Sequence, residues 1–425
     1  MTVTVLFGSF FLGLLLAMPA ALALALACAA AIVVSDRLPG TLLPQQIVAT
    51  LDSTPLLAIP LFILLGEIVA RSSLGLRLVE LCQALVGWMR GGLAQANVVA
   101  SMFFGGISGA ATADTAAIGS VMIPAMRRQG YPAAFSAVVT CTSSVMGNLI
   151  PPTIDLIIYG WLTGTPIDRL FAAGIVPGLT IGLCLMAMSY LVSRRRGYGE
   201  RTPFVVREVG RTGLRAVPAL VMPVLIIGGI FGGMITVTEA AVVAILYGLG
   251  LTVLVYRELG WRDLLPILAG TVRTVGGVMF LIGVAAAFGW ILTIERVPQN
   301  LSATLLDLYP GPAAFALTVI AVSLFCGLFL TPATALIILT PIFFPLSRSF
   351  GYDPIHFGIL LISSLALGHV TPPIGLTLFI GASLAKVPVD ALLRPLAPFF
   401  LALLVAVLLI AFIPALSLTL PGLMR

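Results

Sequence analysis

Residues 147–153 read GNLIPPT, where a glycine, an asparagine and two adjacent prolines interrupt a stretch rich in apolar and small residues. In a water-exposed loop this composition would mark an ordinary turn. Here the long apolar flanks indicate a membrane-spanning segment. A helix that breaks in hydrocarbon leaves backbone amide and carbonyl groups without partners, so the break is kept only where it lines a polar cavity or is buried in protein.

The composition predicts an all-α polytopic membrane protein. Of the 425 residues, 60% are hydrophobic and 9% are charged, and the mean hydropathy is +1.16. Soluble domains do not have this balance, and continuous apolar runs argue against the alternating strands of a β-barrel. The first run lacks a basic start, so we interpret it as a membrane helix rather than a cleaved signal peptide. The runs fall near 3–34, 45–70, 166–192, 216–235, 238–256, 273–293 and 390–416.

The opening stretch has a twin, GHVTPPI at 368–374, and the two belong to matching regions, 92–163 and 312–385. Several matches in one fixed register, including two double prolines, indicate a duplicated unit rather than chance similarity. A shift of 221 positions carries Pro124 onto Pro345, Gly130-Tyr131 onto Gly351-Tyr352, Ser143 onto Ser364, Gly147 onto Gly368, Pro151-Pro152 onto Pro372-Pro373, Gly160 onto Gly381 and Pro177 onto Pro398.

The basic residues predict that the two units are inverted. The arginine-rich loop that begins at 194 is expected to be cytoplasmic. Segments 95–107 and 112–126 are shorter than the roughly 20 residues that span a bilayer, so we expect a re-entrant hairpin there. A second hairpin, 313–346, then enters from the opposite side. With a cytoplasmic N-terminus and an external C-terminus, 17 of the 22 basic residues lie inside and the other five outside: Arg37, Arg169, Arg296, Arg348 and Arg425.

This pattern divides the chain into three expected parts, and inverted repeats with paired broken helices are typical of secondary transporters. The first repeat, 1–192, has scaffold helices 3–70, an arm 71–90, a hairpin 92–127, a broken helix 132–163 and a helix 166–192. Residues 193–237 hold the basic loop and a connector helix. The second repeat, 238–425, has scaffold helices 238–293, an arm 295–310, a hairpin 312–347, a broken helix 354–385 and a helix 390–416.

Each hairpin tip is expected to face the break of its own repeat and to form a cation site with it. Exposed carbonyl oxygens are hard ligands that suit Na⁺, and hydroxyls add to them. The alternative is that small residues only allow close helix packing. The first Na⁺ site is predicted at Ser108, Gly109, Gly147, Ile150 and Pro152. The second is predicted at Thr331, Thr334, Gly368 and Thr371.

Four polar residues near the tips and breaks are candidates for binding a polar substrate. Asn148 and His369 stand at equivalent positions of the two breaks, Thr112 follows the first tip, and Asp155 follows the first double proline. For His369, satisfying the local backbone is the alternative role. Asp114 lies just past the first tip, where it either caps the following helix or tunes the cation site.

No catalytic or nucleotide-binding motif is present, so the chain is not predicted to be an enzyme or an ATPase. Transport energy then comes from an ion gradient or from a separate ATPase chain. The five scattered cysteines predict no metal cluster, and we expect no cofactor besides Na⁺ as coupling ion. The arginine loop sets topology rather than binding nucleic acid. A passive pore and an intramembrane enzyme are the other classes, but a pore needs no paired breaks and an enzyme needs a convergent acid–base or metal cluster.

The chain resembles the large membrane subunit of the TRAP (tripartite ATP-independent periplasmic) transporters. The resemblance covers essentially the whole chain and rests on the order of five segments: GISGAATADTAAIGSVMIPAM (106–126), RRQGYP (127–132), GNLIPPT (147–153), PIFFP (341–345) and GHVTPPIG (368–375). Two positions depart from the family pattern: Ala110, where a second serine is common, and Thr331, where an acidic residue is common.

The resemblance implies Na⁺-coupled import of an organic acid, such as a C4-dicarboxylate or a sugar acid, across the bacterial inner membrane by an elevator mechanism. The implied partners are a periplasmic substrate-binding protein and a separate small four-helix membrane subunit; nucleic acid is not among them. The C-terminus would be periplasmic. The family's sodium sites map onto Ser108 with 147–152, and onto the second tip with Gly368 and Thr371. The nearest rival is a self-sufficient Na⁺- or H⁺-coupled divalent-anion carrier, which shares the inverted repeat.

Overall fold

The computed structural model describes residues 1–425 except 36, 200–202, 298, 300–310, 373–374 and 425. Within these residues all regular structure is helical, which confirms the predicted all-α class. Six helices are long and apolar enough to cross a membrane, and a bent pair could form a seventh span. Arg201, Arg425, Pro373 and most of the expected arm 295–310 lie outside the described residues.

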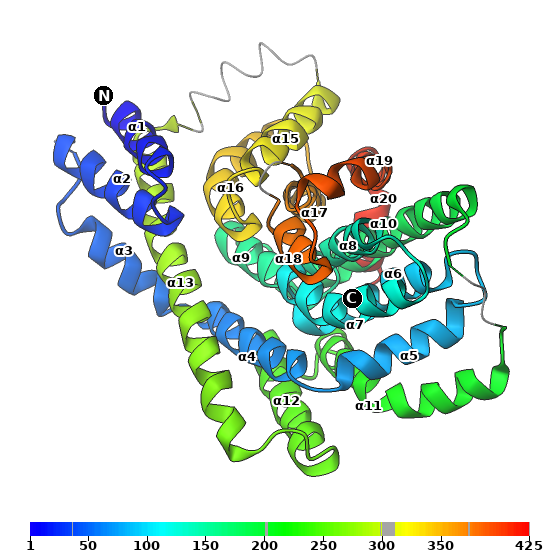
Figure 1. Ribbon diagram of the computed structural model, residues 1–425. Coiled ribbons are helices and arrows are strands. Elements are labelled where there is room, and N and C mark those ends of the chain that lie inside the picture. Colours follow the sequence, from blue (N-terminus) through cyan, green and yellow to red (C-terminus); the bar gives the residue numbers. More distant parts are fainter. Residues whose placement is uncertain (36, 200–202, 298, 300–310, 373–374, 425) are drawn as a thin grey trace.

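The helices form two groups (Figure 1). The outer group, at the left and bottom of the view, comprises α1 (Thr2–Leu15), α2 (Ala20–Val34), α3 (Leu42–Leu51), α4 (Ala58–Ala70), α5 (Leu74–Val86), α11 (Val206–Phe231), α12 (Val237–Leu249) and α13 (Trp261–Ile294). The core group comprises α6 (Gly92–Ser108), α7 (Ala111–Arg128), α8 (Ala133–Ser144), α9 (Ile154–Thr163), α10 (Ile167–Arg196), α15 (Pro312–Gly327), α16 (Pro332–Ser349), α17 (Pro354–Gly368), α18 (Leu376–Ala385), α19 (Asp390–Phe412) and α20 (Ala415–Leu423).

The prediction of one membrane helix over 3–34 is wrong, because the chain turns back between α1 and α2. Ala17 adopts φ 57°, and Pro19 precedes α2, where it cannot donate a backbone hydrogen bond. The Met18 N–H closes the turn by donating to the Gly13 carbonyl at 3.0 Å. The two helices then pack so closely that a Cβ on Gly13 would lie 2.8 Å from the Ala23 Cβ.

Several other boundaries differ from the predicted ones. The expected run 45–70 is a pair of helices, Leu42–Leu51 and Thr54–Ala70, bent by 65°. The hairpin helices are longer than expected: α6 has 17 residues and α7 has 18, so α7 is about 27 Å long. Neither helix is among the six described helices that are long and apolar enough to cross a membrane, so the re-entrant hairpin stays a prediction. What distinguishes the hairpin is where its tip lies, as described below.

The helix bounds follow the same 221-residue shift as the sequence. Shifting α7 (Ala111–Arg128) gives 332–349, the bounds of α16, and shifting α9 (Ile154–Thr163) gives 375–384, within one residue of α18. The shift also carries α1 onto 223–236, which overlaps the end of α11. The helix over 216–235, which we expected to be an extra connector, thus has a counterpart in the first half of the chain.

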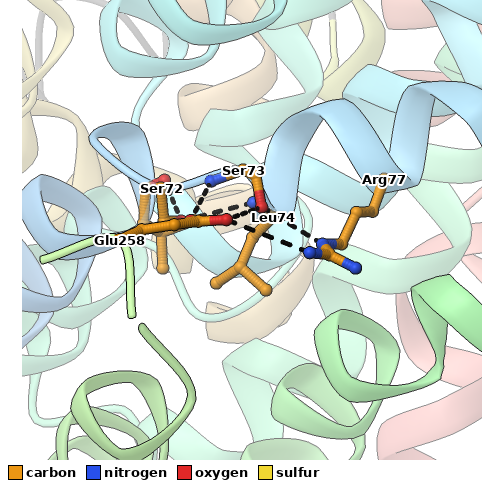
Figure 2. Close-up of polar contacts among 6 residues, drawn as sticks. Ser72, Ser73, Leu74, Arg77 and Glu258 are labelled. Atoms are coloured by element: carbon orange, nitrogen blue, oxygen red, sulfur yellow. Dashed lines mark hydrogen bonds and ion pairs between the residues drawn. The ribbon is translucent and has the colours of Figure 1, made fainter. Parts of the chain in front are cut away.

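The predicted first arm is α5, and its start is held by the loop between α12 and α13 (Figure 2). Glu258 from that loop accepts a hydrogen bond from the Ser73 N–H at 2.8 Å and a second from the Ser73 hydroxyl. Arg77 lies 3.9 Å from the Glu258 carboxylate and 3.9 Å from the centre of the Tyr256 ring. Because the first amides of a helix lack partners within the helix, Glu258 caps α5 and fixes it to the outer group.

Candidate functional site

The first hairpin tip packs directly against the first break, as predicted. Gly109 has φ +64°, and a Cβ there would lie 2.6 Å from the Pro152 carbonyl oxygen, so only glycine fits. A Cβ on Gly105 would lie 3.0 Å from the Gly147 Cα. The tip therefore ends between α8 and α9, part-way along the broken helix. The predicted residues Gly109, Gly147 and Pro152 belong to this contact.

Asn148 joins the break to the tip by a hydrogen bond. Its carboxamide oxygen accepts from the Ala111 N–H, at the start of α7, at 3.0 Å. The Asn148 amide nitrogen is buried and has no hydrogen-bond partner among the described residues. The Asn148 oxygen thus satisfies the first amide of α7, a role that the sequence did not predict, and the N–H₂ group remains available as a donor.

Other residues predicted for the first site take different positions. The Ser108 hydroxyl is buried, and no described residue makes a hydrogen bond to it. The Ile150 side chain lies against α10, where a Cβ on Gly178 would come within 2.4 Å of it. The Asp114 carboxylate makes no hydrogen bond to a described backbone amide, so its predicted role as a helix cap is wrong.

The second tip meets the second break in the same way. A Cβ on Gly327, at the end of α15, would lie 2.6 Å from the Gly368 Cα. Thr331 caps α16, since its hydroxyl accepts from the Thr334 N–H at 3.4 Å and lies 2.9 Å from the Thr334 hydroxyl. The Thr371 hydroxyl, just past the end of α17, donates to the Leu367 carbonyl of that helix at 2.8 Å, which leaves its lone pairs free.

Both tips and both breaks line one cavity of about 270 Å³. All four substrate candidates, Thr112, Asn148, Asp155 and His369, are in its wall, together with Gly109 and Thr331. The His369 ring is buried, and neither of its nitrogens has a hydrogen-bond partner among the described residues. Ser108, Thr334, Gly368 and Thr371 are not among the lining residues. Any ion held by them would therefore lie behind the cavity wall.

The cavity is also lined by the first turns of four helices. These are α7 at Ala111, α9 at Ile154, α16 at Pro332 and α18 at Leu376. Each helix N-terminus carries about half a positive charge. The described lining residues include no lysine or arginine. The cavity is thus suited to an anion through backbone electrostatics rather than basic side chains.

Sequence reasoning missed three wall residues that come from the outer group: Ile63 on α4, and Thr274 and Val278 on α13. The cavity therefore lies where the outer and core groups meet. Thr274 is a threonine at the start of an otherwise apolar run, but its hydroxyl donates to the Gly270 carbonyl at 3.1 Å, as threonines within helices commonly do. The residue type alone gave no signal for a cavity.

The family to which the chain belongs follows from a comparison with known families. Residues 7–416 match the model of the "Tripartite ATP-independent periplasmic transporter, DctM component". The chain belongs to this family. The resemblance seen in the sequence is thereby confirmed: the chain is the large permease subunit of a TRAP transporter, a multi-pass membrane protein and not an enzyme.

Relatives in the TRAP family are similar along most of the chain. It is 38% identical over 373 residues to the C4-dicarboxylate TRAP transporter large permease protein DctM of Pseudomonas aeruginosa, covering 88% of this chain and 87% of that protein. It is 35% identical over 419 residues to the sialic acid TRAP transporter large permease protein SiaM of Vibrio cholerae, covering 98% of each. Among solved structures, the Alcanivorax borkumensis YdaH transporter has a similar fold, with a TM-score of 0.62 over 89% of this chain and 88% of that one at 16% identity.

Proposed function

We propose that this chain imports a small organic acid by cation-coupled transport and that the acid binds in the central cavity. The observation that carries the proposal is the convergence of four helix N-termini on one cavity. The Asn148 N–H₂ group and the His369 ring add side-chain donors for a carboxylate. The named relatives handle C4-dicarboxylates and sialic acid, which are organic acids of the same kind.

Bound Na⁺ supplies the positive charge that the cavity wall lacks. The only charged residue among the described lining residues is Asp155, which repels an anion when ionised. A cation held close behind the wall lowers the electrostatic free energy of the bound anion. We place the two Na⁺ sites as predicted: Ser108 and Gly109 with Gly147–Pro152 in the first repeat, and Thr331, Thr334, Gly368 and Thr371 in the second.

Movement of the core group against the outer group is the proposed elevator step. The cavity lies between the two groups and includes Ile63 and Thr274 from the outer one. The core group would carry the acid and Na⁺ past these residues, with α5 as the arm that transmits the motion. The capped start of α5 at Ser73 and Glu258 then serves as the fixed end of the arm.

The proposed orientation in the bacterial inner membrane keeps the arginine-rich loop in the cytoplasm. The helices α1 and α2 have 14 and 15 residues, fewer than the roughly 20 that span a bilayer, and form a hairpin whose two ends lie on the same side. We propose that this is the periplasmic side, which puts the start of α1 there rather than in the cytoplasm. The numbers of basic residues on the cytoplasmic and periplasmic sides are unchanged, because the first basic residue, Arg37, follows α2. The path from α1 to α10 is then the inverse of the path from the end of α11 to α19.

A periplasmic substrate-binding protein and a small four-helix membrane subunit are the proposed partners, in keeping with a tripartite family. The test is uptake of radiolabelled succinate or sialic acid into proteoliposomes that contain the chain and its small subunit. We expect uptake only with an inward Na⁺ gradient and added binding protein. Asn148→Ala should abolish it, whereas Arg211→Gln, at an exposed surface ion pair, should not.

Uptake that proceeds without the binding protein would overturn the tripartite mechanism in favour of a self-sufficient carrier. Uptake that is equal with Na⁺ and with K⁺ gradients would overturn sodium coupling.

A further inference from the structure

A basic pocket lies at one end of the core group, away from the central cavity. It has a volume of about 470 Å³ and is formed where α8 begins, α10 ends and α19 begins. Arg195 and Arg196 of α10 and Arg394 of α19 are in its wall. None of its described lining residues is acidic, and the ion pairs found among the described residues do not include these arginines. The pocket therefore concentrates positive charge that no described side chain neutralises.

The pocket is shaped by a backbone turn and a cluster of aromatic rings. Gly197 ends α10 with φ +68°, and the Tyr198 N–H donates back to the Ser193 carbonyl at 3.1 Å. This turn brings the Tyr198 ring to 5.1 Å from the ring centre of Phe135 on α8, which lies 5.8 Å from that of Phe399 on α19. The rings thus join all three helices. Because these helices belong to the core group, the pocket stays intact when that group moves against the outer one.

The ends of two membrane-spanning helices place the pocket at the membrane surface. Both α10 and α19 are long and apolar enough to cross a membrane, and the pocket lies at the end of one and the start of the other. Its wall combines the arginines with apolar groups of Phe135, Val192, Pro395 and Pro398. The start of α8, which has no side-chain cap, adds a partial positive charge. Such a pocket matches a phospholipid that carries a charged phosphate on an apolar body.

Membrane topology alone does not explain where these arginines lie. The positive-inside tendency requires basic residues on the cytoplasmic side, but not around a pocket. Arg194 belongs to the same run and is exposed, yet it is not among the lining residues.

The opposite end of α19 has a second pocket, of about 410 Å³, which provides a comparison. It lies beside the start of α17, the helix onto which the 221-residue shift carries α8. Phe135 lines the first pocket and its counterpart His356 lines the second. The described lining residues of the second pocket include Asp353 but no arginine or lysine. The fold therefore forms a pocket at both ends, and only the one beside α10 is basic.

We infer that the basic pocket binds the phosphate of one anionic phospholipid, with Arg195, Arg196 and Arg394 around it. Guanidinium groups bind phosphate oxygens through paired, charge-assisted hydrogen bonds. The same chemistry accepts a free phosphate ion, but a free ion leaves the apolar part of the wall uncovered. The inference goes beyond the proposed function, because this binding requires neither substrate nor Na⁺.

The test is a titration of the full-length purified protein with phosphatidylglycerol in neutral detergent without Na⁺, with bound lipid counted by native mass spectrometry. We expect one phosphatidylglycerol to bind more tightly than phosphatidylcholine. Arg394→Gln should weaken this affinity about fivefold, and the double variant with Arg195→Gln about 25-fold. Arg194→Gln is the matched control: it removes the same charge from the end of α10 but outside the pocket wall, so the affinity should stay near the wild-type value.

Equal losses in Arg194→Gln and Arg394→Gln would overturn the inference, because they would show a general effect of surface charge. Phosphatidylcholine that binds as tightly as phosphatidylglycerol would also overturn it, because both lipids carry a phosphate but only one has a net charge. Inorganic phosphate is the third arm. If inorganic phosphate binds with the same dependence on Arg394 while phosphatidylglycerol does not bind, the lipid assignment is refuted.

Discussion

The two helix breaks have nearly the same backbone plan but different chemistry. In the first, Asn148 accepts a hydrogen bond from the Ala111 N–H and ties the break to the tip. In the second, His369 takes the equivalent position. Here it is the backbone carbonyl of His369, not its side chain, that accepts a hydrogen bond, from the Thr377 hydroxyl at 2.9 Å. Each break keeps a glycine-to-glycine contact with its tip. The comparison indicates that the backbone contacts determine how tip and break pack in both repeats, whereas the polar side chains determine how the two repeats differ in chemistry.

The glycine contacts should show the largest effects. Gly368→Ala puts a Cβ 2.6 Å from the Gly327 backbone, so the hairpin must shift, whereas Gly147→Ala puts a Cβ 3.3 Å from Ala110. We expect Gly368→Ala to reduce the free energy of unfolding by about 3 kcal/mol and Gly147→Ala to reduce it by less. Thermal unfolding in detergent measures both. Gly228→Ala, in open space on α11, is the control and should stabilise slightly. Equal losses at the two breaks would contradict the difference expected from these two distances.

The Asn148 and His369 pair should separate stability from transport. Asn148→Ala leaves the buried Ala111 N–H unpaired, which should lower the free energy of unfolding by about 2 kcal/mol. His369→Ala removes no side-chain hydrogen bond within the described residues, so its stability should change little. Both variants should lose uptake in proteoliposomes, because each removes a donor from the cavity. Normal uptake by the His369→Ala protein would show that the side chain of the second break does not bind the substrate.

A smaller effect is expected at the start of α5, where the loop between α12 and α13 holds it. Glu258→Gln weakens the cap on Ser73 and the ion pair with Arg77, which should lower the free energy of unfolding by about 1 kcal/mol. Uptake should fall as well if α5 is the arm. The control is Glu208→Gln, whose 3.5 Å pair with Arg211 is exposed and contributes almost nothing. Unchanged uptake in Glu258→Gln would argue against a role for this anchor in transport.

Much of the fold could be predicted because the membrane restricts the choices so strongly. Apolar runs identified most of the helices, and Gly147 with its double proline marked a break because such residues are rarely tolerated in hydrocarbon without a purpose. The register shared with Gly368 then predicted which segments correspond. These signals are local in sequence, so they can be recognised without knowledge of the tertiary contacts.

The misses arose where local sequence carries no signal. The turn between α1 and α2 is built from Leu16, Ala17, Met18 and Pro19, which read as part of one apolar run. Thr274 reaches the cavity only because α13 packs against the core group. Asp114 was recognised as unusual, but its complete burial depends on how α6 and α8 pack around α7. These are properties of contacts between distant segments, which composition and spacing do not encode.

The most direct test of the central claim, that the two breaks with their tips are sodium sites, is thermal unfolding of the purified protein in NaCl, KCl and choline chloride. A ligand that binds only the folded state adds RT ln(1 + [L]/Kd), about 2.7 kcal/mol at a hundredfold excess over Kd. The account predicts a higher Tm in Na⁺ alone, with part of the rise lost in Ser108→Ala and another part in Thr371→Val. The same Tm in all three salts would contradict it.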